Sequence, residues 1–213
     1  DLELSAPLLD SLAALKQLAA RYPNRLQKGV PVTLRQESTC LQDEVDAVWT
    51  DNEGNLARLV VEASRILNTE GPRLSVLARY WPAHLALQLH GAPGITYVVG
   101  SDGVVALGPL SQDLAESLLL SLLAWWQKGM TKPLPVTARL VEAVLAKTEG
   151  DLSTLDSWQQ DSIEYEYNIA GGAFHRQFPD LSQIPLSQFV EVGEALYLPL
   201  FHALAGEIGR AHV

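Results

Sequence analysis

The sequence predicts an α+β fold in which a mixed central sheet is flanked by helices. Short β-rich runs alternate with segments of helical periodicity, and glycine-containing turns join some of the runs as hairpins. One long amphipathic helix is predicted in the middle of the chain. Strands interleaved with helices, with hairpins among the strands, are typical of this fold class. A chain of 213 residues with 47% hydrophobic residues is long enough to bury such a core.

The first part of the chain reads as helix, strand and hairpin. Residues 10–22 form an amphipathic pattern that ends before Pro23. Residues 27–39 contain an alternating run typical of a strand. The runs 45–49 and 56–63 are separated by a loop in which Gly54 supplies a positive φ, so they predict a hairpin.

A second helix and a second hairpin follow. The helix is predicted over residues 75–89, with a kink or a broken start at Pro82 because proline lacks an amide proton. The runs 95–100 and 104–107 predict two short strands around the turn residues 101–103.

The segment 111–135 predicts the long helix. Ser111 can cap its first turn, because the hydroxyl accepts from an unpaired amide. Gly129 is predicted to end the helix, and Pro133 prevents its continuation. Apolar side chains at helical spacing predict a buried stripe of Leu118, Leu119, Leu122, Leu123 and Trp126. Trp125 lies outside this stripe, so a second layer or a partner chain is expected to cover it.

The composition changes after residue 150. A further helix is predicted over 136–147, an acidic stretch follows at 151–167, and a closing helix is predicted over 189–205. We therefore expect an α/β core over residues 1–150. Residues 151–213 would form an acidic linker and a helical extension that packs on the core.

Charge and composition exclude several classes of function. The net charge of −10 argues against a broad phosphate-binding surface, although local basic clusters can still contact nucleic acid. Cys40 is the single cysteine, which excludes an internal disulfide and suits a cytoplasmic protein. No apolar run approaches the roughly 20 residues of a membrane span. Because the sequence starts without Met or a signal pattern, we expect a piece of a larger protein.

Carboxylates near the predicted strands are the first candidates for catalysis. They are Glu37, Asp43, Glu44, Asp46 and Glu62. The order of elements resembles the PD-(D/E)XK nuclease core, in which two strand-borne acids hold Mg²⁺ and a lysine two residues after the second acid assists the attacking water. Asp46 and Glu62 could be these acids, but Ser64 occupies the lysine position and no lysine lies between Lys28 and Lys128. We therefore favour solvated strand residues over catalysis.

The sequence predicts no metal site, no cofactor site and no small-molecule substrate. The five histidines lack the i, i+4 spacing of a helix-borne metal site. Neither a G-x-S-x-G nucleophile elbow nor a phosphate-binding loop occurs. No catalytic set remains.

Basic residues near aromatic ones form two candidate contact sites for DNA or for a partner protein. The residues are Arg73, Arg79 and Trp81 near the second helix, and Trp125, Lys128 and Lys132 at the end of the long helix. Such groups can stack on bases or hold phosphates. Burial in a core or an interface is the more frequent role of aromatics at helical spacing.

Several ordered segments resemble the RecC C-terminal domain family of exodeoxyribonuclease V. They are Trp81-Pro82-Ala83-His84-Leu85, Tyr97-Val98-Val99-Gly100, Trp126-Gln127-Lys128-Gly129-Met130 with Pro133-Leu134-Pro135, and Glu194-Ala195-Leu196-Tyr197-Leu198-Pro199-Leu200. The resemblance implies a restriction-endonuclease-like fold that has lost its metal site. It also implies RecB-like and RecD-like partner subunits, and DNA in the full complex.

Two other functions stay open at this point. One is an active metal-dependent nuclease that uses Asp46 and Glu62. The other is a stand-alone interaction adaptor outside DNA metabolism.

Overall fold

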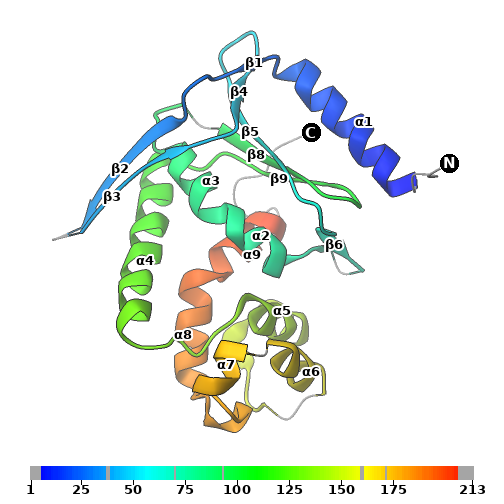
Figure 1. Cartoon of the computed structure of the whole chain (residues 1–213). Helices are drawn as coiled ribbons and strands as arrows, with labels where there is room; N and C mark the ends of the chain where they lie inside the picture. The colour runs from blue at the N-terminus through cyan, green and yellow to red at the C-terminus, as the bar shows by residue number, and fades with distance from the viewer. Residues whose placement is uncertain are drawn as a thin grey trace. The chain divides into compact units, whose positions relative to one another are not determined.

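The fold is built on a five-stranded sheet with the strand order β1-β4-β5-β8-β9 (Figure 1). The computed structural model describes residues 6–36, 39–69, 71–92, 94–158, 161–170 and 172–205, so Glu37 lies outside the described residues. The strands are β1 (Asn24–Arg25), β4 (Val48–Thr50), β5 (Leu56–Val61), β8 (Gly94–Val99) and β9 (Val104–Leu107). Among the described strands of this sheet, β5 and β8 form the one parallel pair. The predicted mixed sheet of an α+β protein is therefore confirmed, and it is compatible with a restriction-endonuclease-like fold.

Helices pack on opposite faces of this sheet. On one face, Leu18 of α1 (Ala6–Arg21) and Tyr22 form a buried cluster with Leu59 and Tyr97. The neighbouring residue in β8, Thr96, points the other way, because side chains alternate along a strand. Its hydroxyl lies 3.0 Å from Nδ1 of His84 in α3 (Trp81–Gln88). Both faces of β8 are thus covered.

The parallel β5–β8 pair requires a crossover connection, which the predicted second helix supplies. This segment is α2 (Leu74–Leu77), then the 3₁₀ turn η1 (Ala78–Tyr80), then α3. Pro82 stands in the first turn of α3, where its missing amide costs no hydrogen bond. The predicted broken start is confirmed. A small hairpin of β6 (Leu67–Asn68) and β7 (Gly71–Pro72) precedes α2.

Both predicted hairpins of the main sheet are present. β4 and β5 pair in antiparallel fashion around a loop in which Gly54 has φ +87°. β8 and β9 pair around Asp102 and Gly103. In the first loop, the Asp51 carboxylate accepts from the amides of Glu53 and Asn55 and so holds the turn.

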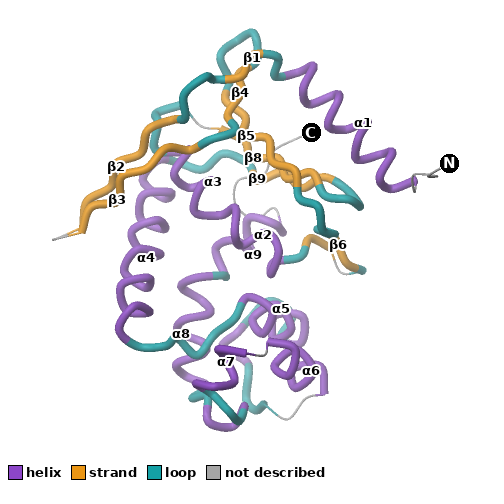
Figure 2. The backbone as a smooth tube through the Cα atoms, viewed as in Figure 1, coloured by secondary structure: helices purple, strands orange, loops and turns teal. Residues whose placement is uncertain are grey.

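The strand β3 (Thr39–Val45) was not predicted, and neither were the two-residue strands β1, β6 and β7. β2 (Val30–Gln36) matches the predicted run, but it pairs with β3 in a separate two-stranded hairpin (Figure 2). The predicted strand 45–49 is wrong at its start, because the chain leaves β3 at Val45 and turns at Ala47, where φ is +55°. Polar Gln42 and Asp43 interrupt the apolar alternation of β3, so the sequence pattern is weak there.

The long helix α4 spans Gln112–Thr131. The predicted cap is confirmed, since the Ser111 hydroxyl accepts from the Leu114 amide at 3.4 Å. The predicted end at Gly129 is wrong: the Thr131 hydroxyl and the Lys132 amide both donate to the Lys128 carbonyl and extend the last turn. Trp126 was predicted to be buried but is 57% exposed. Of the other members of the predicted stripe, Leu119 and Leu123 are buried, and Leu118 and Leu122 are half-buried.

The structure divides into two compact units, Asp1–Leu120 with His202–Val213, and Ser121–Phe201. The second unit contains helices with bounds α5 (Ala138–Lys147), η2 (Leu152–Thr154), α6 (Asp161–Ala170), α7 (Gly172–Gln177), η3 (Leu181–Gln183) and α8 (Leu186–Leu196). The predicted acidic linker therefore includes helices. The predicted closing helix is interrupted at Tyr197, before α9 (Leu198–Ala205) with Pro199 in its first turn. The boundary predicted at residue 150 falls inside this unit and stays a prediction.

None of the helices in the described ranges combines the length and the apolar composition needed to cross a membrane.

We expect Asp102→Ala to destabilise the sheet by about 2 kcal/mol. The Asp102 carboxylate accepts from the amides of Ile66 (2.8 Å) and Leu67 (3.2 Å), and Arg65 Nε lies 3.3 Å away. Alanine would leave these amides, one of them on fully buried Ile66, without an acceptor. Urea unfolding followed by circular dichroism measures the change. The exposed loop residue Asp156, replaced in the same way, is the matched control and should shift stability by less than about 0.5 kcal/mol.

Candidate functional site

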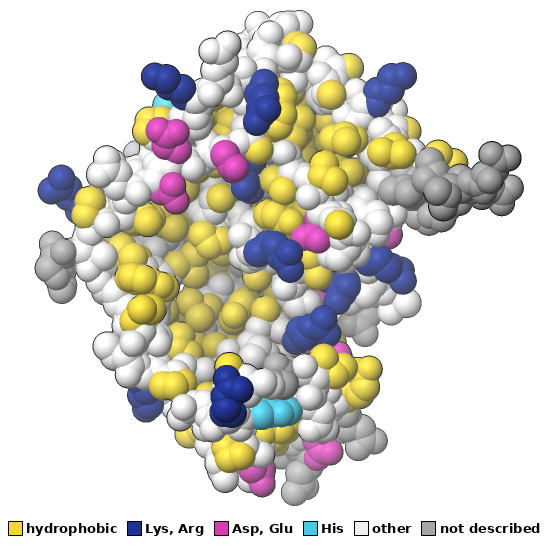
Figure 3. Space-filling model, in the orientation of Figure 1, with side chains coloured by type: hydrophobic (Ala, Val, Ile, Leu, Met, Phe, Trp, Pro, Cys, Tyr) yellow, Lys and Arg dark blue, Asp and Glu magenta, His cyan; other side chains and the backbone are white. Residues whose placement is uncertain are grey.

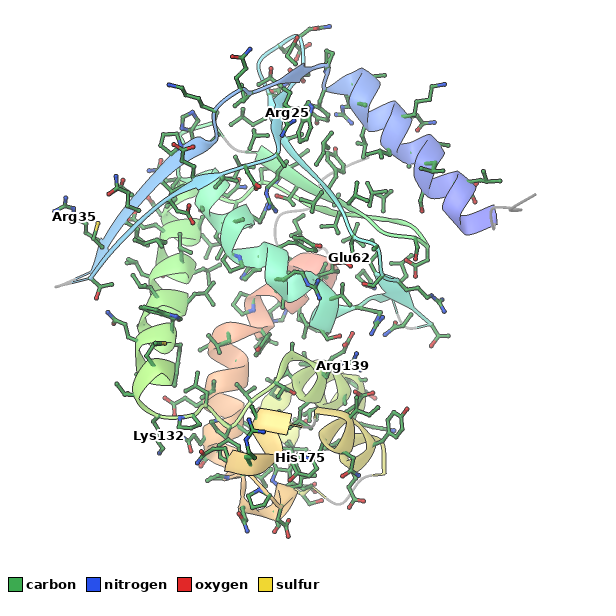
Figure 4. The ribbon with its side chains drawn as sticks, viewed as in Figure 1. Arg25, Arg35, Glu62, Lys132, Arg139 and His175 are labelled. Carbon is green, nitrogen blue, oxygen red and sulfur yellow. The ribbon has the colours of Figure 1, made fainter. Side chains whose placement is uncertain are left out.

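The two predicted acids lie at the same end of the sheet. Asp46 immediately precedes the β3–β4 turn, and Glu62 directly follows β5. Because β4 and β5 are antiparallel, the start of β4 and the end of β5 point toward the same end of the sheet. Figure 4 shows Glu62 beside the α2–α3 segment. This is the place where a nuclease of this fold would need its metal ligands.

Glu62 is buried and its carboxylate is occupied by four donors. Oε1 accepts from the amide (3.0 Å) and the hydroxyl (2.8 Å) of Ser64. Oε2 accepts from Nη1 of Arg79 (3.1 Å) and from the hydroxyl of Tyr80 (2.6 Å). The bond from Tyr80, followed by the bonds from Ser64, lowers the pKa of Glu62 to about 2. The carboxylate is thus a structural acceptor, since a metal ion would have to displace these donors.

Ser64 stands at the position where the nuclease motif has its lysine. Its hydroxyl turns back onto Glu62, so this position reinforces the charged form of the acid. On the other side of the carboxylate, burial raises the pKa of Tyr80, and its hydrogen bond to Glu62 adds to the effect. Tyr80 therefore stays protonated and donates to Glu62.

Asp46 differs from Glu62, because its side chain is 84% exposed. It forms an ion pair of 3.4 Å with Nη2 of Arg58, which is itself buried on β5. Arg58 Nε also donates to the Asp46 main-chain carbonyl at 3.3 Å.

Burial, with a smaller contribution from the Arg58 charge, lowers the pKa of the neighbouring His84 to about 4. His84 is therefore neutral at pH 7, and Arg58 supplies the positive charge.

A third carboxylate at this end of the sheet follows the same pattern, since Asp102 pairs with Arg65 at 3.3 Å. Each acid therefore faces an arginine, with the pairs Asp46–Arg58, Glu62–Arg79 and Asp102–Arg65. Arginine stays protonated at all working pH values and neutralises the charge that would attract a divalent cation. Within the described ranges, no group of three or more His, Cys, Asp or Glu side chains could hold a metal ion.

The first group of predicted contact residues, Arg73, Arg79 and Trp81, differs in exposure to solvent. Trp81 is only 2% exposed and stacks on His84, so its ring is part of the core and cannot contact DNA or a partner there. Arg79 is 60% exposed but is held by Glu62. Arg73 is half-buried and donates to the Arg65 carbonyl at 3.1 Å. Figure 3 shows Lys and Arg side chains on the face that carries α2 and β6.

The second group lies at the end of α4. The Lys128 ammonium sits 3.8 Å from the centre of the Trp125 ring, a cation–π contact. Lys132 is exposed (labelled in Figure 4). The most exposed apolar side chains here are Trp126 (57%) and Met130 (69%). The helical periodicity placed Trp126 in the buried stripe and did not include Met130. Their i, i+4 spacing is the signal that could have found them, because it places both on one helix face.

Comparison with known proteins gives one family. Residues 3–149, more than half of the chain, match the family model described as the RecC C-terminal domain. A comparison with curated proteins gave no match.

Proposed function

The chain belongs to the RecC C-terminal domain family, and we propose that it is a non-catalytic structural and DNA-handling domain of the RecBCD helicase–nuclease, exodeoxyribonuclease V. Family membership supports a role in that complex, in DNA repair and recombination. The proposed partners are RecB-like and RecD-like subunits, and the proposed compartment is the cytoplasm. Neither a cofactor nor a small-molecule substrate is part of this proposal.

One observation carries the non-catalytic part of the proposal: four donors occupy the Glu62 carboxylate. Two of them, Arg79 and Tyr80, come from the crossover segment, and Ser64 replaces the lysine of the nuclease motif. A metal-dependent nuclease needs carboxylates that are open to Mg²⁺ and a group that positions water. The active nuclease based on Asp46 and Glu62 is therefore the less favoured function.

Direct metal titration tests this. We expect no saturable binding of Mg²⁺ or Mn²⁺ by calorimetry at millimolar metal, and the same heats for the Asp46→Ala/Glu62→Ala double variant. The physical reason is that each carboxylate already has a cationic partner. Incubation of the chain with linear duplex DNA and Mg²⁺ should leave the DNA intact.

Micromolar metal binding that disappears in the double variant would contradict the proposal and support the nuclease. Because Glu62 also supports the fold, the Asp46→Ala single variant is the matched control. Asp46 is exposed and its replacement leaves the Glu62 cluster in place.

The scaffolding part of the proposal rests on surfaces. Trp126 and Met130 of α4 form an exposed apolar face, and exposed aromatic side chains of this kind mark protein interfaces. Trp125 and Lys128 lie next to it on α4, and Lys132 directly follows the helix. These three residues are proposed to contact a partner or DNA. For DNA, we propose Arg73 with Arg79 at the crossover, because both are arginines beside the nuclease-like site.

A further inference from the structure

A cavity of about 490 Å³ opens between the β2–β3 hairpin and α3. Apolar side chains from the four elements β2, β3, α3 and α4 line it: Val32, Leu41, Pro82, Ala83, Ala86 and Leu119. All of them belong to the first unit. A volume of this size lies in the range of roughly 300–1,000 Å³ that ligand pockets occupy. The cavity shares Asp46 and Arg79 with the nuclease-like site, but its apolar lining belongs to neither that site nor the exposed face of α4.

The cavity has an acidic residue on its apolar lining. In the hairpin register, Val30 faces Val45, Val32 faces Asp43 and Leu34 faces Leu41. Because side chains alternate along a strand, Asp43 lies on the same face as Leu41 and Val45, and it lines the cavity with them. A carboxylate on this face contributes nothing to apolar packing. Its position fits the recognition of a cation that arrives among apolar groups.

The acidic side chains that line the cavity outnumber the basic ones. Asp43, Glu44 and Asp46 all line it, and among the described residues Arg79 is the one basic side chain in the lining. Arg79 pairs with Glu62, and Asp46 pairs with Arg58. The Asp43 carboxylate accepts from the Glu44 amide at 2.8 Å, and no salt bridge between described residues involves Asp43 or Glu44. Figure 3 shows Asp and Glu side chains over the hairpin, above a hollowed apolar area.

We infer that this cavity, the hairpin groove, binds a segment of a partner subunit in which one Lys or Arg is flanked by apolar residues. The inference rests on the proposed function, because it names a docking site within the same complex. The apolar lining takes the flanking side chains, and the Asp43 carboxylate accepts from the cation. Charge-assisted hydrogen bonds of this kind are about twice as strong as neutral ones. A small-molecule ligand is less favoured, because an apolar groove with one acid on its lining suits an extended chain.

The test uses the full chain and fluorescently labelled 15-residue peptides that tile the helicase and nuclease partner subunits. Binding is measured by fluorescence anisotropy. We expect the binding peptides to contain Lys or Arg between apolar residues, and Asp43→Lys to weaken them at least about tenfold. Exchange of the peptide's base for Glu should abolish binding to the native chain and restore it to Asp43→Lys. This charge exchange reports on one contact and not on general stability.

Two further variants complete the design. Ala83→Phe fills the groove from α3 and should weaken the same peptides at least about tenfold, with an unchanged thermal midpoint. Asp156→Lys adds the same charge in an exposed loop outside the groove and should leave binding unchanged. Equal binding of the peptides to Asp43→Lys and to the native chain would overturn the inference, as would the absence of any binding peptide.

Co-purification with the partner subunits separates this inference from the proposed function. If the native chain does not co-purify, the proposed function fails. If the native chain, Asp43→Lys and Ala83→Phe co-purify equally well, the hairpin groove is not a docking site and the proposed function stands.

Discussion

Glu62→Gln is expected to lower the free energy of unfolding at pH 7 by about 2 kcal/mol. A carboxylate accepts at both oxygens, whereas glutamine has one acceptor oxygen and one NH₂ group that only donates. The NH₂ group would then face either Ser64 or the pair Arg79 and Tyr80, all of which donate to Glu62 in the native chain. Two donors in a buried site would lose their acceptor. Urea unfolding at pH 7, followed by tryptophan fluorescence, measures the loss.

The effect of this substitution should depend on pH in a defined direction. The pKa of Glu62 is about 2 in the folded chain, against an ordinary value of 4.5. Since folding lowers this pKa, the charged carboxylate stabilises the fold above pH 4.5, and its contribution is lost as the pH falls from 4.5 to about 2. The contribution is on the order of 3 kcal/mol at most. The stability difference between the native chain and Glu62→Gln should therefore shrink over this window.

Asp46→Asn is the matched control for both measurements. Asp46 belongs to the same end of the sheet, but its side chain is 84% exposed and its single ion pair is 3.4 Å long. The Asp46 carboxylate is solvated and asparagine keeps an acceptor oxygen for Arg58, so we expect a change below about 0.5 kcal/mol at pH 7. A Glu62→Gln variant as stable as Asp46→Asn would show that the four donors do not hold the carboxylate as described.

The parts of the fold that the sequence predicted correctly are those with strong local signals. β5 and β8 are mostly apolar, the β4–β5 and β8–β9 turns contain glycine, and Pro82 marks the start of α3. β3 was missed because the face that carries Leu41 and Val45 also carries the polar residue Asp43, which breaks the apolar alternation expected of a strand. The helices α6 and α7 were missed because the segment is acidic and rich in turn residues, while α6 gains its stability from packing against α5.

The candidate site was predicted only in part, for a similar reason. Asp46 and Glu62 were found from their positions near strand ends. Their arginine partners could not be found, because each pair joins residues brought together only by the fold: Arg58 reaches across the β4–β5 pair, and Arg79 comes from the crossover. The absence of a lysine near Glu62 was evident from the sequence. The hydrogen bonds that Ser64, Arg79 and Tyr80 donate to Glu62 are evident only from the structure.

The exposed face of α4 should control assembly. We expect the double variant Trp126→Ala/Met130→Ala to bind the partner subunits at least about 30-fold more weakly, because exposed tryptophans that become buried are common hot spots worth about 2 kcal/mol. Both side chains are largely exposed, at 57% and 69%, so folding should be unaffected. Co-purification and surface plasmon resonance with the purified partner subunits measure the loss, and a thermal melt checks the fold.

Two comparisons make the assembly result specific to this face. Trp125→Ala removes a half-buried ring of α4 that makes a cation–π contact with Lys128. This variant should weaken assembly less than the double variant does, and it should lower the stability of the fold more. Tyr165→Ala removes an equally exposed aromatic (63%) from α6 and should leave assembly unchanged. If the double variant assembled with native affinity, the apolar face would have to be solvated in the complex. The partner contacts would then belong to another surface, and the hairpin groove would be the first to examine.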